Sequence, residues 1–215
     1  MEKVLIAGAN GTTGREIVKN LQDHSSYEPI AMIRKEEQQA TFDNMNVKSV
    51  MGDLEGDLAP AVKGIDRVIF AAGSGGKNVE GVDRDGAINL IDQAKAAGVR
   101  KFVMLSSMGA DDPSQNEDLK SYLEAKKTAD EHLRTSFLEH SIVRSGALTN
   151  NAKTNKIKAA EKLGEYGEIP RQDVAQVLID CLEPNLLKNR TFEILSGDKA
   201  TPIALKEIDQ ISFKE

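Results

Sequence analysis

Tyr122 and Lys126 are two residues of this 215-residue chain whose types and spacing could carry out a reaction together. They lie in NEDLKSYLEAKKTADEHLRTSFL, whose apolar pattern predicts a helix within 116–138. Side chains four residues apart lie on the same face of a helix. An ammonium group beside a phenol favours the ionised phenol, so the pair could donate or accept a proton during a reaction.

The predicted helix has an apolar side that a lysine interrupts. Lys120 and Lys127 face elsewhere, whereas Lys126 is in the stripe. A lysine there is either unfavourably placed or functional, because burying its charge is unfavourable. Chance gives a tyrosine and a lysine at this spacing in roughly one chain in four of such composition, so the spacing alone is weak support. The members of the stripe are Leu119, Tyr122, Lys126, Ala129, Leu133 and Phe137.

A glycine-rich stretch near the start of the chain could bind a phosphate group. Gly8, Gly11 and Gly14 follow the apolar run 4–7, which predicts a strand. The segment REIVKNL predicts a helix beginning near Thr12 and Thr13, and a helix N-terminus offers free N–H groups and a partial positive charge to a pyrophosphate. Gly8 would then form the turn, Gly11 would admit the phosphate, and Gly14 would let the helix pack on the sheet. The alternative is a purely structural turn.

Alternating strands and helices must position these residues. Apolar runs predict strands at 4–8, 28–34, 47–52, 67–73, 101–107, 140–146 and 191–195. Helical patterns lie near 14–22, 35–43, 57–63, 80–98, 116–138 and 171–183, with polar loops at 109–117 and 149–168. This alternation predicts an α/β protein with a Rossmann-like, doubly wound parallel sheet and helices on both faces. We expect a single domain over 1–215, with a nucleotide-binding core at 1–146 and a short substrate-side and C-terminal region at 147–215.

Charge and composition exclude several classes of function. The net charge of −6 and the pI of about 5.3 leave no broad basic surface, so we expect neither nucleic acid nor a membrane as a partner. The single cysteine, Cys181, allows no intrachain disulfide and reads as a buried thiol, which fits a reducing, cytoplasmic location. No signal peptide precedes Val4, and no apolar run approaches membrane-spanning length. The three histidines lack metal-ligand spacing, so no metal is expected.

The motifs resemble, as a set, those of the extended and atypical short-chain dehydrogenases/reductases. The stretch GANGTTG, residues 8–14, has the GxxGxxG spacing of that family, with Asn10 inside the motif. Gly52-Asp53-Leu54 is similar to the segment after the third strand, and Ala71-Ala72-Gly73 to the end of the fourth. Residues 86–107 resemble the long helix and fifth strand. The nearest likeness is to small bacterial NAD(P)-dependent epimerase/dehydratase-like or NAD(P)H-binding proteins, including NmrA-like ones.

This resemblance implies roles for several residues. Residues 8–14 would hold the pyrophosphate, Asp53 with Leu54 would contact adenine, and residues 71–73 would border the cofactor. Lys126 would bond the nicotinamide ribose as well as assist Tyr122. Ser107 would hydrogen-bond the substrate oxygen, with Ser106 as the neighbour most easily confused with it. Asp83 stands where the family commonly has asparagine, in a helical stripe with Ala87, Leu90, Ile91 and Ala94, and we include it in the catalytic set.

The end of the second predicted strand indicates which nicotinamide cofactor is preferred. An NAD site usually has an acid there that accepts hydrogen bonds from the ribose hydroxyl. This chain has Arg34 and Lys35 instead, with no acid before Glu36. Arg34 can bind a 2′-phosphate through two hydrogen bonds, and Lys35 adds a point charge, so NADP(H) is favoured over NAD(H). Two cations on a solvated surface are the alternative.

These observations lead to one function and two alternatives. We expect an NADP(H)-binding oxidoreductase that moves hydride between the nicotinamide and a carbonyl or hydroxyl carbon of a small-molecule substrate. The alternatives are an NAD(P)-dependent epimerase or dehydratase, and a non-catalytic NADP(H)-sensing regulator. The short region at 147–215 and Asp83 favour the regulator, whereas Tyr122 with Lys126 favours an enzyme. A monomer or a homodimer is expected.

Overall fold

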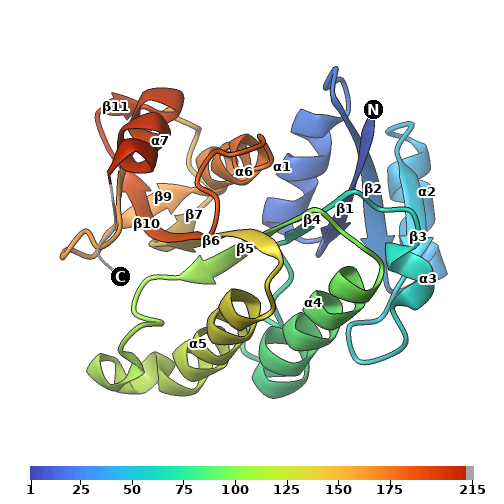
Figure 1. Ribbon diagram of the computed structural model, residues 1–215, viewed down its shortest axis with the longest axis horizontal. Coiled ribbons are helices and arrows are strands. Elements are labelled where there is room, and N and C mark those ends of the chain that lie inside the picture. Colours follow the sequence, from blue (N-terminus) through green and yellow to red (C-terminus); the bar gives the residue numbers. More distant parts are fainter. Residues whose placement is uncertain (212–215) are drawn as a thin grey trace.

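A nine-stranded sheet runs through the protein in a computed structural model, which describes residues 1–211 (Figure 1). Its strands stand in the order β11-β8-β10-β6-β5-β4-β1-β2-β3. They are β1 (Glu2–Ala7), β2 (Tyr27–Ile33), β3 (Lys48–Met51), β4 (Arg67–Phe70), β5 (Lys101–Ser107), β6 (Glu139–Ser145), β8 (Lys156–Ala160), β10 (Arg190–Ser196) and β11 (Lys199–Ala200). A separate two-stranded sheet joins β7 (Ala147–Thr149) to β9 (Glu168–Pro170).

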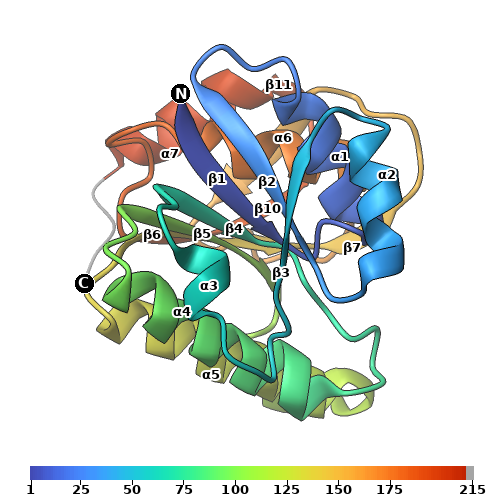
Figure 2. The same ribbon diagram turned by 90° about the vertical axis from the view of Figure 1, so that its right-hand side faces the viewer.

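Helices cover both faces of this sheet, as Figure 2 shows edge-on. Helices α1, α2, α6 and α7 pack on one face, and α3, α4 and α5 on the other. They are α1 (Thr12–Leu21), α2 (Gln39–Asp43), α3 (Ala59–Val62), α4 (Gly86–Ala96), α5 (Lys120–Thr135), α6 (Arg171–Asp180) and α7 (Thr201–Gln210). A π-helical turn, η2 (Val79–Asp85), leads into α4, and short 3₁₀ turns occur at Glu36–Gln38, Pro113–Gln115 and Glu117–Leu119.

The predicted doubly wound parallel sheet is confirmed. All seven predicted strands are present, and each pairs in parallel with its neighbours among β3, β2, β1, β4, β5, β6 and β10. β1 pairs with β2 on one side and with β4 on the other, so the order of the strands reverses beside β1. In open α/β sheets, ligands bind outside the carboxyl ends of the strands, at the point where the order of the strands reverses.

Side chains of β1 alternate between the two cores. Val4 and Ile6 lie in the core under α1 and α6, whereas Leu5 and Ala7 lie in the core under α4. All four are fully buried. A strand buried on both faces reads as an unbroken apolar run, which is why the sequence near residue 4 has no polar alternation.

The C-terminal part of the sheet differs from the sequence prediction. Residues 149–168 were expected to be a polar loop, but they contain β8, which pairs antiparallel with both β10 and β11. Only Ile157 of its five residues is fully buried. The segment therefore lacks the continuous buried run that marks the other strands, and it depends on pairing with β10. Helix α7 and the short β7, β9 and β11 were not predicted either.

The prediction is also wrong for the two residues at the ends of the apolar stripe. Leu119 precedes α5 and is half exposed, and Phe137 follows its end and is 92% exposed, with φ at +66°. The helix stops at Thr135 because the chain turns there towards β6, so the stripe is buried only between Lys126 and Leu133.

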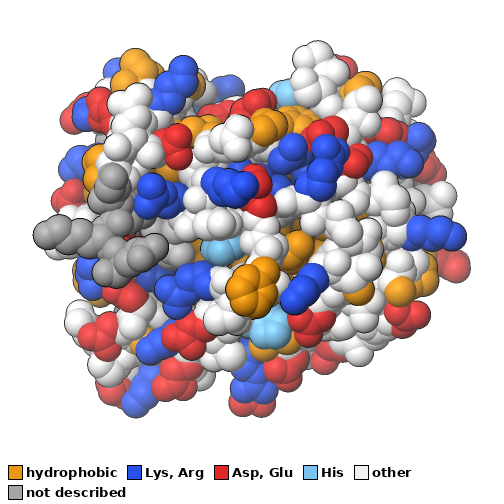
Figure 3. All heavy atoms as spheres, viewed as in Figure 1, with side chains coloured by type: hydrophobic (Ala, Val, Ile, Leu, Met, Phe, Trp, Pro, Cys, Tyr) orange, Lys and Arg blue, Asp and Glu red, His pale blue; other side chains and the backbone are white. Residues whose placement is uncertain are grey.

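The face of the protein drawn in Figure 3 carries side chains of every kind. No helix among residues 1–211 is both long and apolar enough to cross a membrane. On the face drawn in Figure 3, acidic and basic side chains are interspersed. An anionic ligand on that face would therefore be held by individually placed groups rather than by an extended positive field.

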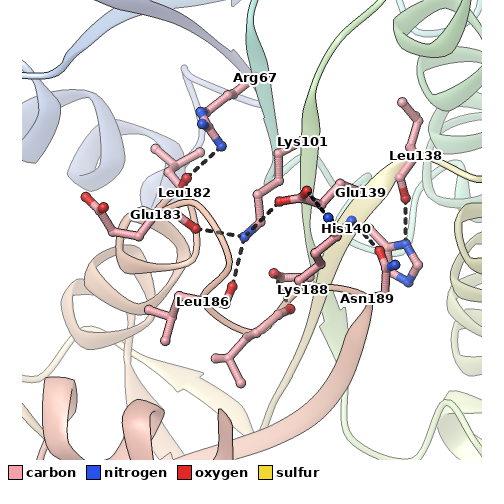
Figure 4. A network of polar contacts seen from close by, with 12 residues as sticks. Arg67, Lys101, Leu138, Glu139, His140, Leu182, Glu183, Leu186, Lys188 and Asn189 are labelled. Carbon is pink, nitrogen blue, oxygen red and sulfur yellow. Dashed lines mark hydrogen bonds and ion pairs between the residues drawn. The ribbon is translucent and has the colours of Figure 1, made fainter.

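A buried lysine joins the amino-terminal edge of the sheet to the segment after α6 (Figure 4). Lys101, at the start of β5, is fully buried, and its Nζ donates to the carbonyl oxygens of Glu183 (3.0 Å) and Leu186 (2.8 Å). Glu139 Oε1 lies 3.8 Å away. Burial lowers the pKa of Lys101, and the charge of Glu139 acts in the opposite direction. The two carbonyls are the partners that make the buried ammonium tolerable.

Two further contacts hold the same segment. Arg67 Nη1 donates to the carbonyl of Leu182 at 2.7 Å, while its Nε bonds Glu2. Asn189 N donates to His140 O at 2.7 Å, and Asn189 Oδ1 accepts from His140 N at 3.2 Å. The link between α6 and β10 is thus fixed by polar contacts with β4, β5 and β6 (Figure 4).

Replacing Lys101 by methionine should lower the free energy of unfolding by about 1–3 kcal/mol, because two carbonyls would lose their donor inside the protein. Urea unfolding measures this effect. The matched control is Lys188→Met, which removes an exposed lysine 2.9 Å from Glu139 and should change stability by about 0.5 kcal/mol or less. An unchanged stability of Lys101→Met would mean that the burial of the charge cancels the two hydrogen bonds.

Candidate nucleotide-binding and active site

The turn between β1 and α1 brings backbone segments too close for side chains. Gly8 has φ at +86°, and a Cβ there would lie 2.6 Å from Ala72 N and 2.7 Å from Ala71 C, just beyond β4. A Cβ at Gly14 would overlap Gly8 O and lie 2.7 Å from Gly8 C. These two glycines are therefore required by the packing of α1, β1 and β4 themselves.

Gly11 is less crowded than Gly8 and Gly14. Its φ and ψ of −75° and 167° suit any residue, and an added Cβ would lie 3.2 Å from Gly8 O, a tight contact that a small shift of the turn would relieve. The side chain at this position would enter the exposed space in front of α1. Packing within the chain constrains Gly11 less than the other two, which suits a ligand that approaches the backbone there.

The N-terminus of α1 is arranged to receive an anion. The first helical hydrogen bond is donated by Arg15 N to Gly11 O at 2.9 Å, so the N–H groups of residues 12–14 precede any intrahelical partner. The first turn carries no acidic residue. Thr13 is buried and Thr12 exposed, and Asn10 is held by Arg15 through Oδ1 (2.7 Å) and its carbonyl (3.2 Å).

The segment after β3 is held beside the start of α4. Leu54 is buried, and a Cβ at Gly86 would lie 2.7 Å from its Cβ. Asn89 Nδ2 donates to the carbonyls of Leu54 (2.9 Å) and Gly56 (2.8 Å), which fixes this loop. Asp53 is exposed, and its Oδ1 accepts from Glu55 N at 3.1 Å. Its carboxylate is accessible at the carboxyl end of β3.

Arg34 and Lys35 lie at the carboxyl end of β2, apart from the buried cluster described below. Both side chains are exposed, and both backbone N–H groups donate to Gln38 Oε1, at 2.9 and 3.2 Å. Lys35 Nζ is 3.5 Å from Glu37 Oε1. Neither cation is tied into the core, so both can reach a ligand at this edge of the sheet.

Lys126 is the buried cation of the site. It is 3% exposed, and its Nζ lies 5.6 Å from the ring centre of Tyr122 and 5.7 Å from that of Phe70. Its nearest polar neighbours are Leu105 O at 3.5 Å and Asp83 Oδ1 at 3.6 Å. Both distances are long for a charged hydrogen bond. Tyr122 is half-buried, and it lies on the same face of α5 as Lys126, as their spacing predicts.

Asp83 is the buried anion opposite Lys126. It is 1% exposed, on η2, and its Oδ2 accepts from Ser74 Oγ (2.6 Å) and Ser74 N (3.1 Å). Its Oδ1 has no hydrogen-bond partner among the described residues. A Cβ at Gly73 would lie 3.2 Å from that oxygen, so the carboxylate sits directly behind the chain that leaves β4.

The two incomplete charges fit a hydroxyl-bearing ligand. One hydroxyl group can accept from Lys126 Nζ and donate to Asp83 Oδ1 at the same time, which no described side chain does. Ribose supplies such hydroxyls, and the room at Gly11 suits a pyrophosphate. The residues present therefore fit a nicotinamide dinucleotide along the edge between β1 and β4.

Ser107 and Ser106 point to different surroundings. Ser107, which ends β5 at the carboxyl edge, is half-buried and donates to Met108 O at 3.1 Å. Ser106 is buried on the α5 side, where its Oγ donates to Asp130 Oδ2 at 3.0 Å. Of the two, Ser107 is the one available to a substrate, and Ser106 is occupied inside the protein.

Asp130 and Arg144 form a buried pair that we did not single out from the sequence as a site. Arg144 Nε donates to Asp130 Oδ2 at 3.0 Å, and Asp130 is fully buried. Burial raises the pKa of Asp130, partly offset by the charge of Arg144 and the hydrogen bond from Ser106. The spacing of Asp130 four residues after Lys126 could have revealed it, since Tyr122, Lys126 and Asp130 recur along one face.

Possible metal ligands are not clustered in the part of the chain that the structure covers. Within residues 1–211, no three histidine, cysteine or carboxylate side chains gather as a metal site. Cys181 is fully buried, and burial raises the pKa of its thiol to about 12.

The unequal roles of the glycines can be tested with two matched variants. Gly11→Val should fold with near-normal stability but lose dinucleotide affinity, because its side chain would fill the space that a pyrophosphate needs. Gly14→Val should lose about 3 kcal/mol of stability, because its side chain would overlap the turn. Thermal unfolding and titration calorimetry measure the two effects. A folded Gly11→Val that retains full affinity would place the nucleotide elsewhere.

Several known proteins are similar to this chain in sequence and in fold. The profile of a family described as NAD(P)H-binding matches residues 8–185. The uncharacterized sugar epimerase YhfK of Bacillus subtilis (strain 168) is 40% identical, over 96% of this chain and 100% of its own. A solved structure from Bacillus halodurans, named "Putative NAD-dependent epimerase/dehydratase", superposes with a TM-score of 0.92 at 35% identity, covering 96% of this chain and all of that one. The oxidoreductase ylbE of Lactococcus lactis has a TM-score of 0.89 at 28% identity, over 99% of each chain. The chain therefore belongs to the NAD(P)H-binding family, whose profile spans its glycine turn, its buried Lys126 and most of its sheet.

Proposed function

We propose that this protein is an NADP(H)-dependent oxidoreductase that acts on a carbonyl or hydroxyl carbon of a small molecule. One observation carries the proposal: the buried and incompletely bonded Lys126 and Asp83 lie beside Tyr122, behind the chain that borders the glycine turn. The oxidoreductase ylbE of Lactococcus lactis supports the reaction class. The domain organisation proposed with it is a nucleotide-binding core at 1–146 and a substrate-side region at 147–215.

The bound cofactor would supply hydride transfer at its nicotinamide ring. The residues at 8–14 would hold the pyrophosphate, and Asp53 with Leu54 would border the adenine. The backbone at 71–73 would line the nicotinamide half, where Lys126 would bond ribose hydroxyls. Their placement along one edge of the sheet supports these roles.

Three side chains would handle the proton and the substrate oxygen. Ser107 would donate a hydrogen bond to that oxygen and so polarise the carbonyl group. Tyr122 would give its proton to the oxygen in reduction and take it back in oxidation. Lys126 would stabilise the ionised phenol, and Asp83 would hold Lys126 in place through its charge.

An epimerase or dehydratase remains the second candidate, because the relatives of the two Bacillus species carry those names. Such an enzyme keeps its cofactor and returns the hydride to the substrate. It would show no net change in NADPH absorbance with substrate, whereas an oxidoreductase consumes NADPH in proportion to product.

A non-catalytic regulator that senses NADP(H) is the third candidate. Asp83 favours it, because it stands where the resembled family commonly has asparagine. Tight NADPH binding without turnover on a broad panel of carbonyl compounds would support this candidate. We propose a monomer or a homodimer in a cytoplasmic setting for all three.

Removing the hydroxyl of Tyr122 separates catalysis from packing. Tyr122→Phe should retain stability and NADPH affinity, while turnover on a panel of small carbonyl compounds falls by about a hundredfold or more. Absorbance at the nicotinamide band measures turnover, and calorimetry measures affinity. Full activity of a folded Tyr122→Phe would rule the phenol out as the proton donor.

Arg34 should decide the preference between the two cofactors. We expect NADPH to bind at least about tenfold more tightly than NADH, because Arg34 can pair with the 2′-phosphate and no acid opposes it. In Arg34→Ala the two affinities should become similar. Lys19→Ala, which removes an exposed cation from the far end of α1, serves as the control and should keep the preference. Equal affinities in the unaltered protein would refute the assignment.

A further inference from the structure

The buried Lys126 and Asp83 are a pair of opposite charges without a direct hydrogen bond. Their 3.6 Å separation leaves Lys126 with one long contact to Leu105 O and Asp83 Oδ1 with none in the described part of the chain. The side chains are 4% and 1% exposed, so water screens neither charge effectively. Two charges in such surroundings act strongly on any charge that binds nearby.

The position of Asp83 determines which part of a bound ligand its negative charge would act on. Its Oδ1 lies 3.2 Å from where a Cβ of Gly73 would be, and Gly73 follows Ala71 and Ala72, which touch the turn at Gly8. The carboxylate therefore stands behind the stretch that borders the gap between β1 and β4, the point at which the order of the strands reverses.

The two redox states of a nicotinamide ring differ in charge. The oxidised ring carries one positive charge, and the reduced ring carries none. A fixed cation therefore favours the reduced form, and a fixed anion favours the oxidised form. Lys126 alone would weaken binding of the oxidised cofactor, and Asp83 opposes this effect.

We propose that Asp83 sets the ratio between the affinities for oxidised and reduced cofactor, and that it does so in favour of the oxidised form. The inference rests on the proposed nicotinamide site, but it does not require turnover. It assigns to the aspartate an electrostatic function that the asparagine common in the resembled family could not perform, because an amide carries no charge.

A consequence for the direction of reaction follows. Tighter binding of the oxidised form makes the bound reduced cofactor a stronger hydride donor. For this two-electron couple, each tenfold tightening of the oxidised form relative to the reduced form lowers the reduction potential of the bound cofactor by about 30 mV. Asp83 would thus favour reduction of the substrate over oxidation.

Dissociation constants of NADP+ and NADPH, measured by calorimetry, test the proposal. The quantity compared is the ratio of the NADP+ constant to the NADPH constant. In Asp83→Asn this ratio should rise by about tenfold, the effect of a unit charge acting across about 10 Å at the effective dielectric constant of a protein. General loosening of the site would weaken both forms alike and cancel in the ratio.

Three further variants separate charge from structure. Lys126→Met should weaken both forms but shift the ratio in the opposite direction. Ser74→Ala removes the hydrogen bonds from Ser74 Oγ but keeps the carboxylate, so the ratio should change by less than about twofold. Asp85→Asn is the matched control: it removes the same charge from the same helical turn, but at an exposed side chain paired with Arg84, and should leave the ratio unchanged.

The outcomes are distinct. An unchanged ratio in a folded Asp83→Asn overturns the proposal and leaves Asp83 a structural residue. If that variant does not fold, the proposal is overturned equally by a Lys126→Met in which the ratio of the NADP+ constant to the NADPH constant rises instead of falling. Failure of the unaltered protein to bind either form refutes the nicotinamide site itself, which is a separate result.

Discussion

The close approach of α1 to the turn after β1 is the constraint on which the site depends. Gly8 lies against the chain leaving β4, and Gly14 lies against Gly8, so three segments meet without a side chain between them. This contact aims the N-terminus of α1 at the gap between β1 and β4. It also sets where residues 71–73 run, and with them the position of Asp83. The ligand edge of the sheet is in this sense a product of backbone packing.

Helix α5 carries the second constraint, because it brings charged groups into an otherwise apolar layer. Lys126 and Asp130 are both buried, and each is compensated by a residue from a different element: Asp83 from η2 and Arg144 from β6. The two pairs differ in quality. Arg144 Nε donates directly to Asp130 Oδ2 at 3.0 Å, whereas Lys126 Nζ and Asp83 Oδ1 stand 3.6 Å apart, and each carboxylate has one oxygen without a hydrogen-bond partner among the described residues. The directly bonded pair of Asp130 and Arg144 fixes the helix against the sheet, and the pair without a direct hydrogen bond leaves Lys126 and Asp83 able to bond a ligand.

Much of this architecture could be predicted from the sequence, because the parallel strands are apolar runs and the glycine turn is local. Burial of Asp83 was predictable from its stripe on a helix, and so was the shared face of Tyr122 and Lys126. Strand β8 was not, since its polar sequence becomes a strand only through pairing with β10. The partnership of Asp130 with Arg144 was missed for a similar reason, because it depends on β6 lying next to β5.

The edges of the sheet have a consequence for how copies of the protein could associate. At one edge stands β3, with four residues and an exposed Lys48, and at the other stands β11, with two. The change to antiparallel pairing at β8 closes the parallel series on that side. An incoming strand would find few free backbone groups at either edge, and a lysine charge at one of them, so neither edge is a good template for fibre growth. Extending the sheet is therefore the less favourable route to self-association, and helix and loop surfaces are the more favourable one.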